Sequence, residues 1–380
     1  MDDLALHRHL IGQQGSRAAL NTPVLVLDAE ALDRNIASMA ALVASHDVGL
    51  RPHAKTHKSV DIASRQIAAG AVGLCCAKIG EAEVLADGCI AGLLITSPVA
   101  APQAIARLAA LAQRAPGIMA VFDHPEVAAT TARALAEAGA TLGAIIDIDP
   151  GIRRTGVASA EHAVALARSI AELPQLAYSG VQFYCGAQQH IEDYAERRAA
   201  IVERTAYLRT VVAALTEAGF APEIVTGSGT GTHRIDLDLG VFSELQAGSY
   251  VFMDRQYLDC DLTGDATAPF ETSLMVDARV VSANHAALVT LDAGFKSLST
   301  DGGKPSVLRG APTDTLFAFM GDEHGALVAP AIGERLRPGD PISLVVPHCD
   351  PTVNLYDHYH LVRGETLVDI WPVSARGRAR

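Results

Sequence analysis

The stretch MAVFDHPEVAATTARALAEAGATLGAIIDI, residues 119–148, shows the pattern from which the rest of the chain can be interpreted. Two short aliphatic runs, Met119–Phe122 and Leu142–Ile148, flank the alanine-rich segment Pro125–Ala138, where apolar residues recur with a helical period. This pattern predicts a strand, a helix and a second strand. Because strands joined through a helix lie parallel in one sheet, the stretch predicts an α/β fold.

The same alternation extends from about residue 22 to about residue 240. Eight strands over about 220 residues favour a (β/α)8 TIM-like barrel, which typically takes about 250 residues. A doubly wound open sheet is the alternative. The expected strands are Val24–Leu27, Gly49–Lys55, Val72–Ala77, Leu93–Thr96, Met119–Phe122, Leu142–Ile148, Ser179–Tyr184 and Ile224–Thr226. The expected helices are Ala29–Ser45, Ser59–Ala69, Gly80–Ala86, Ala101–Ala115, Pro125–Ala138, Ala160–Leu173 and Asp193–Ala218.

After about Thr267 the helical periodicity fades. Short β-rich runs follow, such as Leu274–Val281, Ala287–Leu291 and Ile342–Val346, separated by Gly, Pro and Asp. They predict a smaller, mostly antiparallel domain. We therefore expect a barrel over residues 22–265 and a β-rich domain over residues 266–380, which also takes up part of residues 1–21.

Composition excludes several classes of protein. The chain has 30 Lys and Arg against 43 Asp and Glu residues, a net charge of −13, which disfavours nucleic acid and membranes as partners. Its 49% hydrophobic content excludes global disorder. The charge-free run Gly88–Ala106 contains Pro98 and Pro102 and is interpreted as strand and loop, not as a membrane span. We find no secretion signal, and six scattered cysteines favour reduced thiols and a cytoplasmic location.

A basic segment, Arg51–Lys58, lies at the carboxyl end of the second expected strand. Strand alternation puts Arg51, His53 and Lys55 on one face, at the end of a barrel where active-site groups collect. A partly desolvated lysine beside other cations has its ammonium form disfavoured, and a neutral amine is what Schiff-base chemistry needs. A basic patch on a solvated loop is the alternative.

A glycine-rich segment, Thr226–Thr232, follows the last expected strand. Its alternate glycines let main-chain N–H groups turn inward, and Ser228 and Thr230 add hydroxyls, so the segment suits a phosphate monoester. Barrel phosphate sites often use the loops after the last two strands, and Gly248–Tyr250 could complete the cradle. An ordinary flexible loop is the alternative.

A third segment, Val345–Thr352, lies in the second domain. If a strand continues through it, His348 and Asp350 face one side and Cys349 faces the other. An imidazole and a carboxylate on one face make an open site for Zn²⁺, Mn²⁺ or Mg²⁺. A structural turn is the alternative.

Several single residues also carry useful chemistry. Arg153 and Arg154 follow the sixth strand and either hold an anionic oxygen or lie in solvent. Tyr184 ends the seventh strand with its hydroxyl free to meet a ligand. His190 and the triplet Asp322–His324 offer acid–base groups, although a surface position is more common for such residues.

Six motifs occur in one order along the chain: Arg51–Lys55, Thr226–Gly231, Glu244–Tyr250, Asp292–Lys296, Asp322–Gly325 and His348–Thr352. Together they resemble the metal-dependent D-threonine aldolase family, in the alanine racemase-like group of pyridoxal 5'-phosphate (PLP) enzymes. The resemblance covers nearly the whole chain. It implies a barrel of the alanine racemase N-terminal type, and a homodimer in which the small domain of one subunit closes the barrel mouth of the other.

The resemblance also implies a role for individual residues. Lys55, rather than Lys58 or Lys78, forms the Schiff base with PLP. His348 and Asp350 hold a divalent metal. Apart from the resemblance, the expected mechanism needs a base for the hydroxyl proton, and either His190 or a metal-bound water is the candidate. The other implied cofactor-binding residues are Arg154 by the ring's 3-oxygen, Tyr184 near the pyridine nitrogen, Tyr257, and a phosphate cradle of Ser228, Gly229, Thr230, Gly231, Gly248 and Ser249.

Two positions depart from the family's pattern, with Ala77 in place of a glutamine and Cys185 in place of a histidine. The expected function is retro-aldol cleavage of a D-threonine-type β-hydroxy-D-amino acid to glycine and an aldehyde. The departures leave the substrate range open. The alternatives are a 3-hydroxy-D-aspartate aldolase, a D-serine or 3-hydroxy-D-aspartate dehydratase, a non-catalytic PLP carrier and a metal hydrolase.

Overall fold

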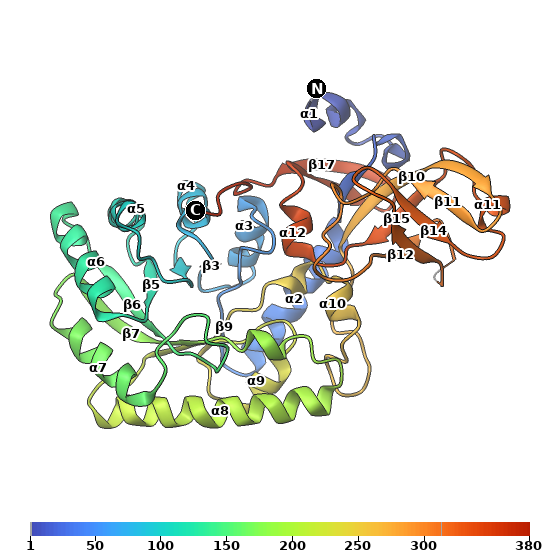
Figure 1. The fold of residues 1–380 in the computed structure, drawn as a ribbon. Coiled ribbons are helices and arrows are strands. Elements are labelled where there is room, and N and C mark those ends of the chain that lie inside the picture. Colours follow the sequence, from blue (N-terminus) through green and yellow to red (C-terminus); the bar gives the residue numbers. More distant parts are fainter. Residues whose placement is uncertain (1, 313) are drawn as a thin grey trace.

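The computed structural model describes residues 2–312 and 314–380, which form a parallel eight-stranded barrel and a nine-stranded, mostly antiparallel sheet. Figure 1 shows the barrel at the left, in blue to yellow, and the sheet at the right, mainly in orange and red. Both parts of the expected fold class are confirmed. Among the described residues, no helix has the length and apolarity needed to cross a bilayer.

Backbone hydrogen bonds close the barrel into a ring. His53 forms a bridge with Cys75: the N–H of Ala54 donates to the Cys75 carbonyl, and the N–H of Cys75 donates to the Pro52 carbonyl, both at 2.8 Å. Strands β2 and β3 are therefore neighbours in the ring. In ring order the strands are β2 (Gly49–Leu50), β9 (Glu244–Leu245), β8 (Ile224–Gly227), β7 (Leu176–Phe183), β6 (Leu142–Asp147), β5 (Met119–Phe122), β4 (Leu94–Ile95) and β3 (Cys75–Cys76).

The prediction that Val24–Leu27 is the first barrel strand is wrong. Strand β1 (Val24–Asp28) forms, but it pairs antiparallel with β10 (Leu274–His285) and parallel with β16 (His358–Arg363) in the second sheet. Four consecutive residues of β1 are buried, so its apolar run fits an interior strand of either sheet. The eighth place in the barrel belongs to β9, whose two residues are too few to show a strand pattern.

The outer helices begin and end within two residues of their expected limits because local signals mark them. The Asp28 carboxylate accepts the N–H groups of Glu30 and Ala31 at the start of α2. Helix α6 begins at a proline and ends before Gly139, which has φ +66°. The helices are α2 (Ala29–Ser45), α3 (Val60–Ala68), α4 (Ile79–Asp87), α5 (Pro102–Arg114), α6 (Pro125–Ala138), α7 (Ala160–Ala171), α8 (Tyr194–Glu217) and the unpredicted α9 (His233–Leu239).

The second sheet carries short helices at its margins, and α12 lies between the sheet and the barrel (Figure 1). Its remaining strands are β11 (Leu288–Leu291), β12 (Ser306–Arg309), β13 (Leu316–Phe319), β14 (Gly325–Val328), β15 (Pro341–Val345) and β17 (Thr366–Pro372). The short helices are α1 (Asp3–His7), α10 (Arg255–Leu258), α11 (Ile332–Arg335) and α12 (Cys349–Val353), with 3-10 turns at Arg8–Leu10, Ser16–Ala19, Gly186–Gln188 and Ser249–Val251.

Candidate active site

A cavity of about 680 Å³ lies at the carboxyl ends of the barrel strands, and residues that follow each of the eight strands contribute to its wall. Cavities of roughly 300–1,000 Å³ are typical of cofactor and ligand sites, and active sites in barrels lie at this end. The cavity brings together most of the expected cofactor-binding residues: Lys55, Arg154, Tyr184, Gly229, Thr230, Gly248, Ser249 and Tyr257.

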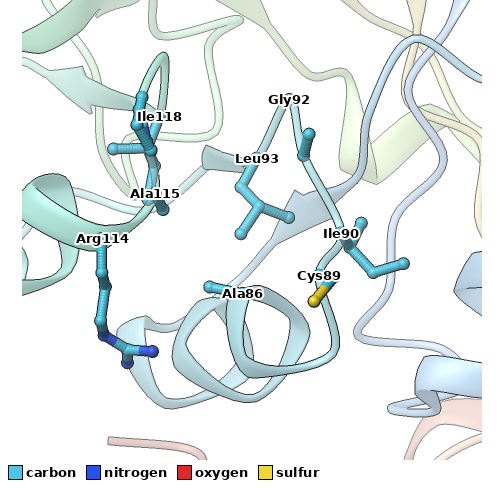
Figure 2. A pocket seen from close by; sticks show the side chains of 10 residues that line it. Ala86, Cys89, Ile90, Gly92, Leu93, Arg114, Ala115 and Ile118 are labelled. Atoms are coloured by element: carbon cyan, nitrogen blue, oxygen red, sulfur yellow. The ribbon is translucent and has the colours of Figure 1, made fainter.

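A smaller cavity of about 210 Å³ lies at the opposite end of the barrel, where β4 and β5 begin (Figure 2). Its wall is largely aliphatic, with Leu93 and Ile118 among its residues. The charged side chain in the wall, Arg114, is already ion-paired with Asp87. This cavity therefore lacks the convergent polar groups of a catalytic site, and the larger one is the candidate.

Lys55 forms an ion pair with Asp350 of α12, across the junction of barrel and sheet. Burial lowers the pKa of Lys55, but the charges of Asp350 and Tyr184 outweigh it and raise that pKa above its ordinary value. Burial raises the pKa of Asp350, and Lys55 and His348 reverse this and lower it. The expectation that neighbouring cations disfavour the ammonium form is thus wrong, because it was made without Asp350, 295 residues away in the chain.

The basic segment divides into structural and cavity-facing residues. Arg51 makes two hydrogen bonds of 2.8 Å to Glu244, so it ties β2 to β9 and is not free for a ligand. Lys58 is buried in an ion pair with Glu81. His53 lines the cavity, where its Nε2 atom lies 3.1 Å from the Thr96 hydroxyl.

Closely packed neighbouring side chains explain two of the glycines around the cavity. A Cβ atom added to Gly248 would lie 2.7 Å from the Thr56 hydroxyl, and one added to Gly229 would lie 2.4 Å from Gln189 Oε1. The Thr56 hydroxyl is buried without a protein hydrogen-bond partner. Together with the hydroxyls of Thr230 and Ser249, this unpartnered group suits an anionic ligand such as a phosphate.

Two residues of the expected phosphate cradle lie outside the cavity lining. Ser228 is buried with φ +69°, and its hydroxyl donates to the Gly229 carbonyl at 3.5 Å. Gly231 packs so tightly that an added Cβ would lie 1.9 Å from the Gln189 carbonyl oxygen. Both shape the loop around the cavity.

His348 and Asp350 come together, but strand alternation is not the reason. Strand β15 ends at Val345, and α12 begins at Cys349 with His348 as its N-cap residue. His348 Nε2 lies 4.0 Å from Asp350 Oδ2, too far for a hydrogen bond. Bonds from divalent cations to such atoms are about 2.0–2.2 Å long, and tetrahedral ligands lie closer together than 4.0 Å, so the two side chains stay predicted metal ligands that a bound cation would draw together.

The remaining candidates differ in their relation to the cavity. The His190 ring centroid lies 4.6 Å from that of Tyr257, and burial and the neighbouring His348 lower the pKa of His190. Asp322, Glu323 and His324 are exposed outside the cavity lining, and Glu323 is ion-paired with Lys296. Of the two departures from the family's pattern, Ala77 lines the cavity, and Cys185 is buried outside its lining.

Sequence reasoning missed a chain of hydrogen-bonded polar side chains, of which Gln182 and Gln246 line the cavity. Gln182 Nε2 donates to Asp147 Oδ1 at 2.9 Å, and Gln246 Nε2 donates to Gln182 Oε1 at 3.2 Å. Strand alternation at the end of β7 could have indicated Gln182. Sequence reasoning also missed Asp301, whose Oδ2 atom lies 2.7 Å from His348 Nδ1.

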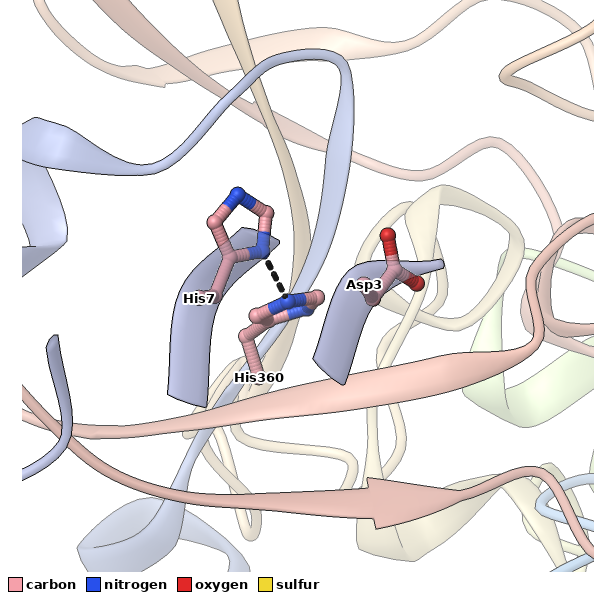
Figure 3. Close-up of side chains that lie close together, drawn as sticks. All are labelled: Asp3, His7 and His360. Carbon is pink, nitrogen blue, oxygen red and sulfur yellow. Dashed lines mark hydrogen bonds between the residues drawn. The ribbon is translucent and has the colours of Figure 1, made fainter. Parts of the chain in front are cut away.

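A second group of histidine and aspartate side chains, the His360 cluster, joins α1 to β16 and consists of Asp3, His7, His358 and His360. Figure 3 shows three of its members, with the 2.8 Å contact between His7 Nδ1 and His360 Nε2. The backbone N–H of Asn21 donates to His7 Nε2 at 3.0 Å. Both ring nitrogens of His7 are thus engaged in hydrogen bonds.

Comparisons with known proteins agree with this architecture. The profile of the alanine racemase N-terminal domain matches residues 27–256, and that of a putative serine dehydratase domain matches residues 273–362. A 3-hydroxy-D-aspartate aldolase of Paracoccus denitrificans (strain Pd 1222) is 38% identical over 94% of this chain and 93% of its own. A D-threonine aldolase of Arthrobacter sp is 38% identical over 96% of this chain and 94% of its own.

A solved structure supports the same assignment. The crystal structure of D-threonine aldolase from Filomicrobium marinum superposes with a TM-score of 0.90 at 38% identity, and the match covers 96% of this chain and 97% of that one. The chain therefore belongs to the alanine racemase-like family, in the group that includes D-threonine aldolase and 3-hydroxy-D-aspartate aldolase.

Proposed function

We propose that this protein is a PLP- and divalent-metal-dependent aldolase that cleaves D-threonine-type β-hydroxy-D-amino acids to glycine and an aldehyde. The observation that carries the proposal is the Lys55–Asp350 ion pair, because it joins a lysine of the cavity wall to a carboxylate that is paired with His348, the side chains that Schiff-base and metal chemistry require. The 38% identity to two aldolases over nearly the whole chain supports it.

The residues in and beside the cavity suit PLP and a divalent metal. Lys55 would hold the aldehyde carbon, Thr230, Gly248 and Ser249 would bind the phosphate, and Arg154 and Tyr184 would lie by the ring, since all of them line the cavity. His348 and Asp350, which lie outside the lining, would hold the metal, and Asp350 contacts Lys55. When bound, PLP accepts the electron pair released as the Cα–Cβ bond breaks, and the metal acidifies the β-hydroxyl.

The chain's own residues orient the substrate and move its protons. Burial raises the pKa of Tyr184, so its phenol stays protonated at neutral pH and offers the ring a hydroxyl without charge. Burial and His348 lower the pKa of His190, so its imidazole is neutral and able to accept a proton. We assign the removal of the β-hydroxyl proton to His190 because cleavage requires a base at that oxygen.

Two observations favour 3-hydroxy-D-aspartate as an alternative substrate. Lys78 is exposed in the cavity wall and forms no ion pair within residues 2–312 and 314–380, so a cation is available for a second carboxylate. The Paracoccus relative is also named as an aldolase of this substrate. If Lys78 serves it, Lys78→Met will lower kcat/KM for 3-hydroxy-D-aspartate about tenfold or more and leave D-threonine cleavage largely unchanged.

A product assay tests the proposed reaction. Purified protein is given D-threonine, D-phenylserine, 3-hydroxy-D-aspartate and D-serine, with and without EDTA. We expect glycine and an aldehyde, and loss of turnover with EDTA. A keto acid and ammonia would identify a dehydratase, and a yellow but inert protein would identify a PLP carrier. Borohydride reduction should attach the cofactor to Lys55, and a tag elsewhere or none at all would overturn the assignment.

We extend the proposal to a cytoplasmic homodimer. Phe295, Leu316 and Met320 are exposed apolar side chains of the second domain, and Phe295 stacks on Phe319 with ring centroids 4.7 Å apart. Apolar side chains grouped in this way are commonly covered by a second protein surface. Sedimentation at micromolar concentration should give twice the 39.8 kDa mass of the chain, and a monomer would contradict the proposal.

A further inference from the structure

The backbone of His348 is held by Ser299, in a loop of the second domain, and by Thr352 of helix α12. The backbone N–H of His348 donates to the Ser299 hydroxyl at 3.1 Å, and the Thr352 hydroxyl donates to the His348 carbonyl at 2.8 Å. The N–H of Ser299 in turn donates to the Thr352 hydroxyl at 3.1 Å. These bonds fix the backbone of His348 against the segment that carries Asp301.

Gly302 allows this segment to approach His348 closely. A Cβ atom added to Gly302 would lie 2.7 Å from the Pro347 carbonyl oxygen and 2.8 Å from the His348 Cβ atom. A larger residue would push the segment away from the histidine. The loop therefore brings Asp301 next to the imidazole, where its Oδ2 atom lies 2.7 Å from His348 Nδ1.

This contact determines which ring nitrogen is free. A carboxylate only accepts hydrogen bonds, so the Nδ1 atom of His348 must carry the proton that it donates to Asp301. In the neutral ring the lone pair then lies on Nε2, 4.0 Å from Asp350 Oδ2. Asp350 Oδ2 also accepts a hydrogen bond from the Lys55 ammonium, so a metal cation bound between Nε2 and this oxygen would replace that contact.

We propose that Asp301 is a positioning residue, which fixes the tautomer and orientation of His348 so that Nε2 and Asp350 bind one divalent cation. The inference rests on the proposed metal site and adds a residue that does not itself contact the metal. Carboxylates that accept the second N–H of a metal-bound histidine typically raise metal affinity by about 10- to 100-fold.

Manganese binding to the PLP-loaded, metal-stripped protein tests the role, with free Mn²⁺ measured by electron paramagnetic resonance. Asp301→Ala should raise the Mn²⁺ Kd about 10- to 100-fold. Asp301→Asn should raise it much less, because the amide oxygen still accepts the Nδ1 proton. The control is Asp314→Asn, an exposed aspartate of the same domain, which should leave Kd unchanged. If Asn weakens binding as much as Ala, Asp301 acts through its charge or as a direct ligand, and the proposal is wrong.

The tautomer of His348 can also be measured directly, without bound metal and without an activity assay. In the metal-free protein with ¹⁵N-labelled histidine, NMR should show the His348 proton on Nδ1, and Asp301→Ala should move part of the population to Nε2. A wild-type proton on Nε2 would overturn the proposal. His348→Ala distinguishes a failure of the metal site from a failure of the positioning role of Asp301. If His348→Ala abolishes Mn²⁺ binding while Asp301→Ala does not weaken it, only the positioning role fails. If His348→Ala leaves binding intact, the metal site fails with it.

Discussion

The His348 cluster, formed by Asp301, His348 and Asp350, contains the same residue types as the His360 cluster but leaves a different nitrogen free. In the His348 cluster, Asp301 engages Nδ1 of His348, and Nε2 faces a second carboxylate at 4.0 Å. In the His360 cluster, both nitrogens of His7 are engaged, by Asn21 and by His360, while His360 Nδ1 is buried without a hydrogen-bond partner. We predict that the His348 cluster binds a divalent metal and that the His360 cluster is a structural hydrogen-bonded group, because the free nitrogen of His348 lies beside a carboxylate.

The largest expected effect separates the two clusters by activity. His348→Ala should lower kcat/KM for the aldol cleavage by about 10³-fold, because Lewis-acid activation of the hydroxyl contributes about 4 kcal/mol. His360→Ala should stay within about twofold of the wild type when assayed on folded protein. The measurement is steady-state kinetics in saturating Mn²⁺. Equal losses in the two variants would contradict the comparison.

Most helices could be predicted from the sequence, whereas the sheet to which β1 belongs could not. Helices α2 and α6 have the predicted limits because Asp28, Pro125 and Gly139 mark their ends locally. Strand β1 was assigned to the wrong sheet because burial on both faces gives the same apolar run in either one. Local sequence carries no information on such a choice.

Long-range contacts account for the part of the site that sequence could not predict. Asp350 and Lys55 are 295 residues apart, so the ion pair that raises the pKa of Lys55 is absent from any local pattern. Asp301 lies 47 residues from His348, in a loop without a motif. The family resemblance indicated the cavity residues, whereas the groups that orient them become visible only after folding.

The second largest expected effect is a loss of stability when the His360 cluster is broken. His7→Ala leaves His360 Nε2 without its partner in a buried position and removes a buried ring, whereas the N–H of the exposed Asn21 can bond to water. We expect a loss of about 3 kcal/mol in the free energy of unfolding, measured in urea, from the unpaired nitrogen and the cavity together. Mn²⁺ affinity should not change. A variant that lost one bound Mn²⁺ per chain would show that the His360 cluster holds metal.

A pH effect follows from the same burial. Burial lowers the pKa of His360 to about 4, from about 6.5 in an unfolded chain. Between these values the unfolded state binds more protons, so stability is present above pH 6.5 and is lost as the pH falls toward 4. The expected loss between pH 7 and pH 5 is about 2 kcal/mol for this group. Urea unfolding at both pH values should show a smaller pH-dependent loss in His360→Gln than in the wild type, and equal losses would contradict the assignment.

The smallest expected effect concerns Asp3, the acidic member of the His360 cluster. Its carboxylate contacts His358 Nδ1 at 3.2 Å in a partly exposed position, so Asp3→Asn should cost less than about 1 kcal/mol in the free energy of unfolding. Asp2→Asn is the matched control, because asparagine also caps a helix well and Asp2 caps α1 through the Ala5 N–H at 2.9 Å. Both variants are compared with and without Mn²⁺. A cost for Asp3→Asn that exceeded about 2 kcal/mol only when Mn²⁺ was present would mean that the ion displaces the His7–His360 hydrogen bond, and the distinction between the clusters would fail.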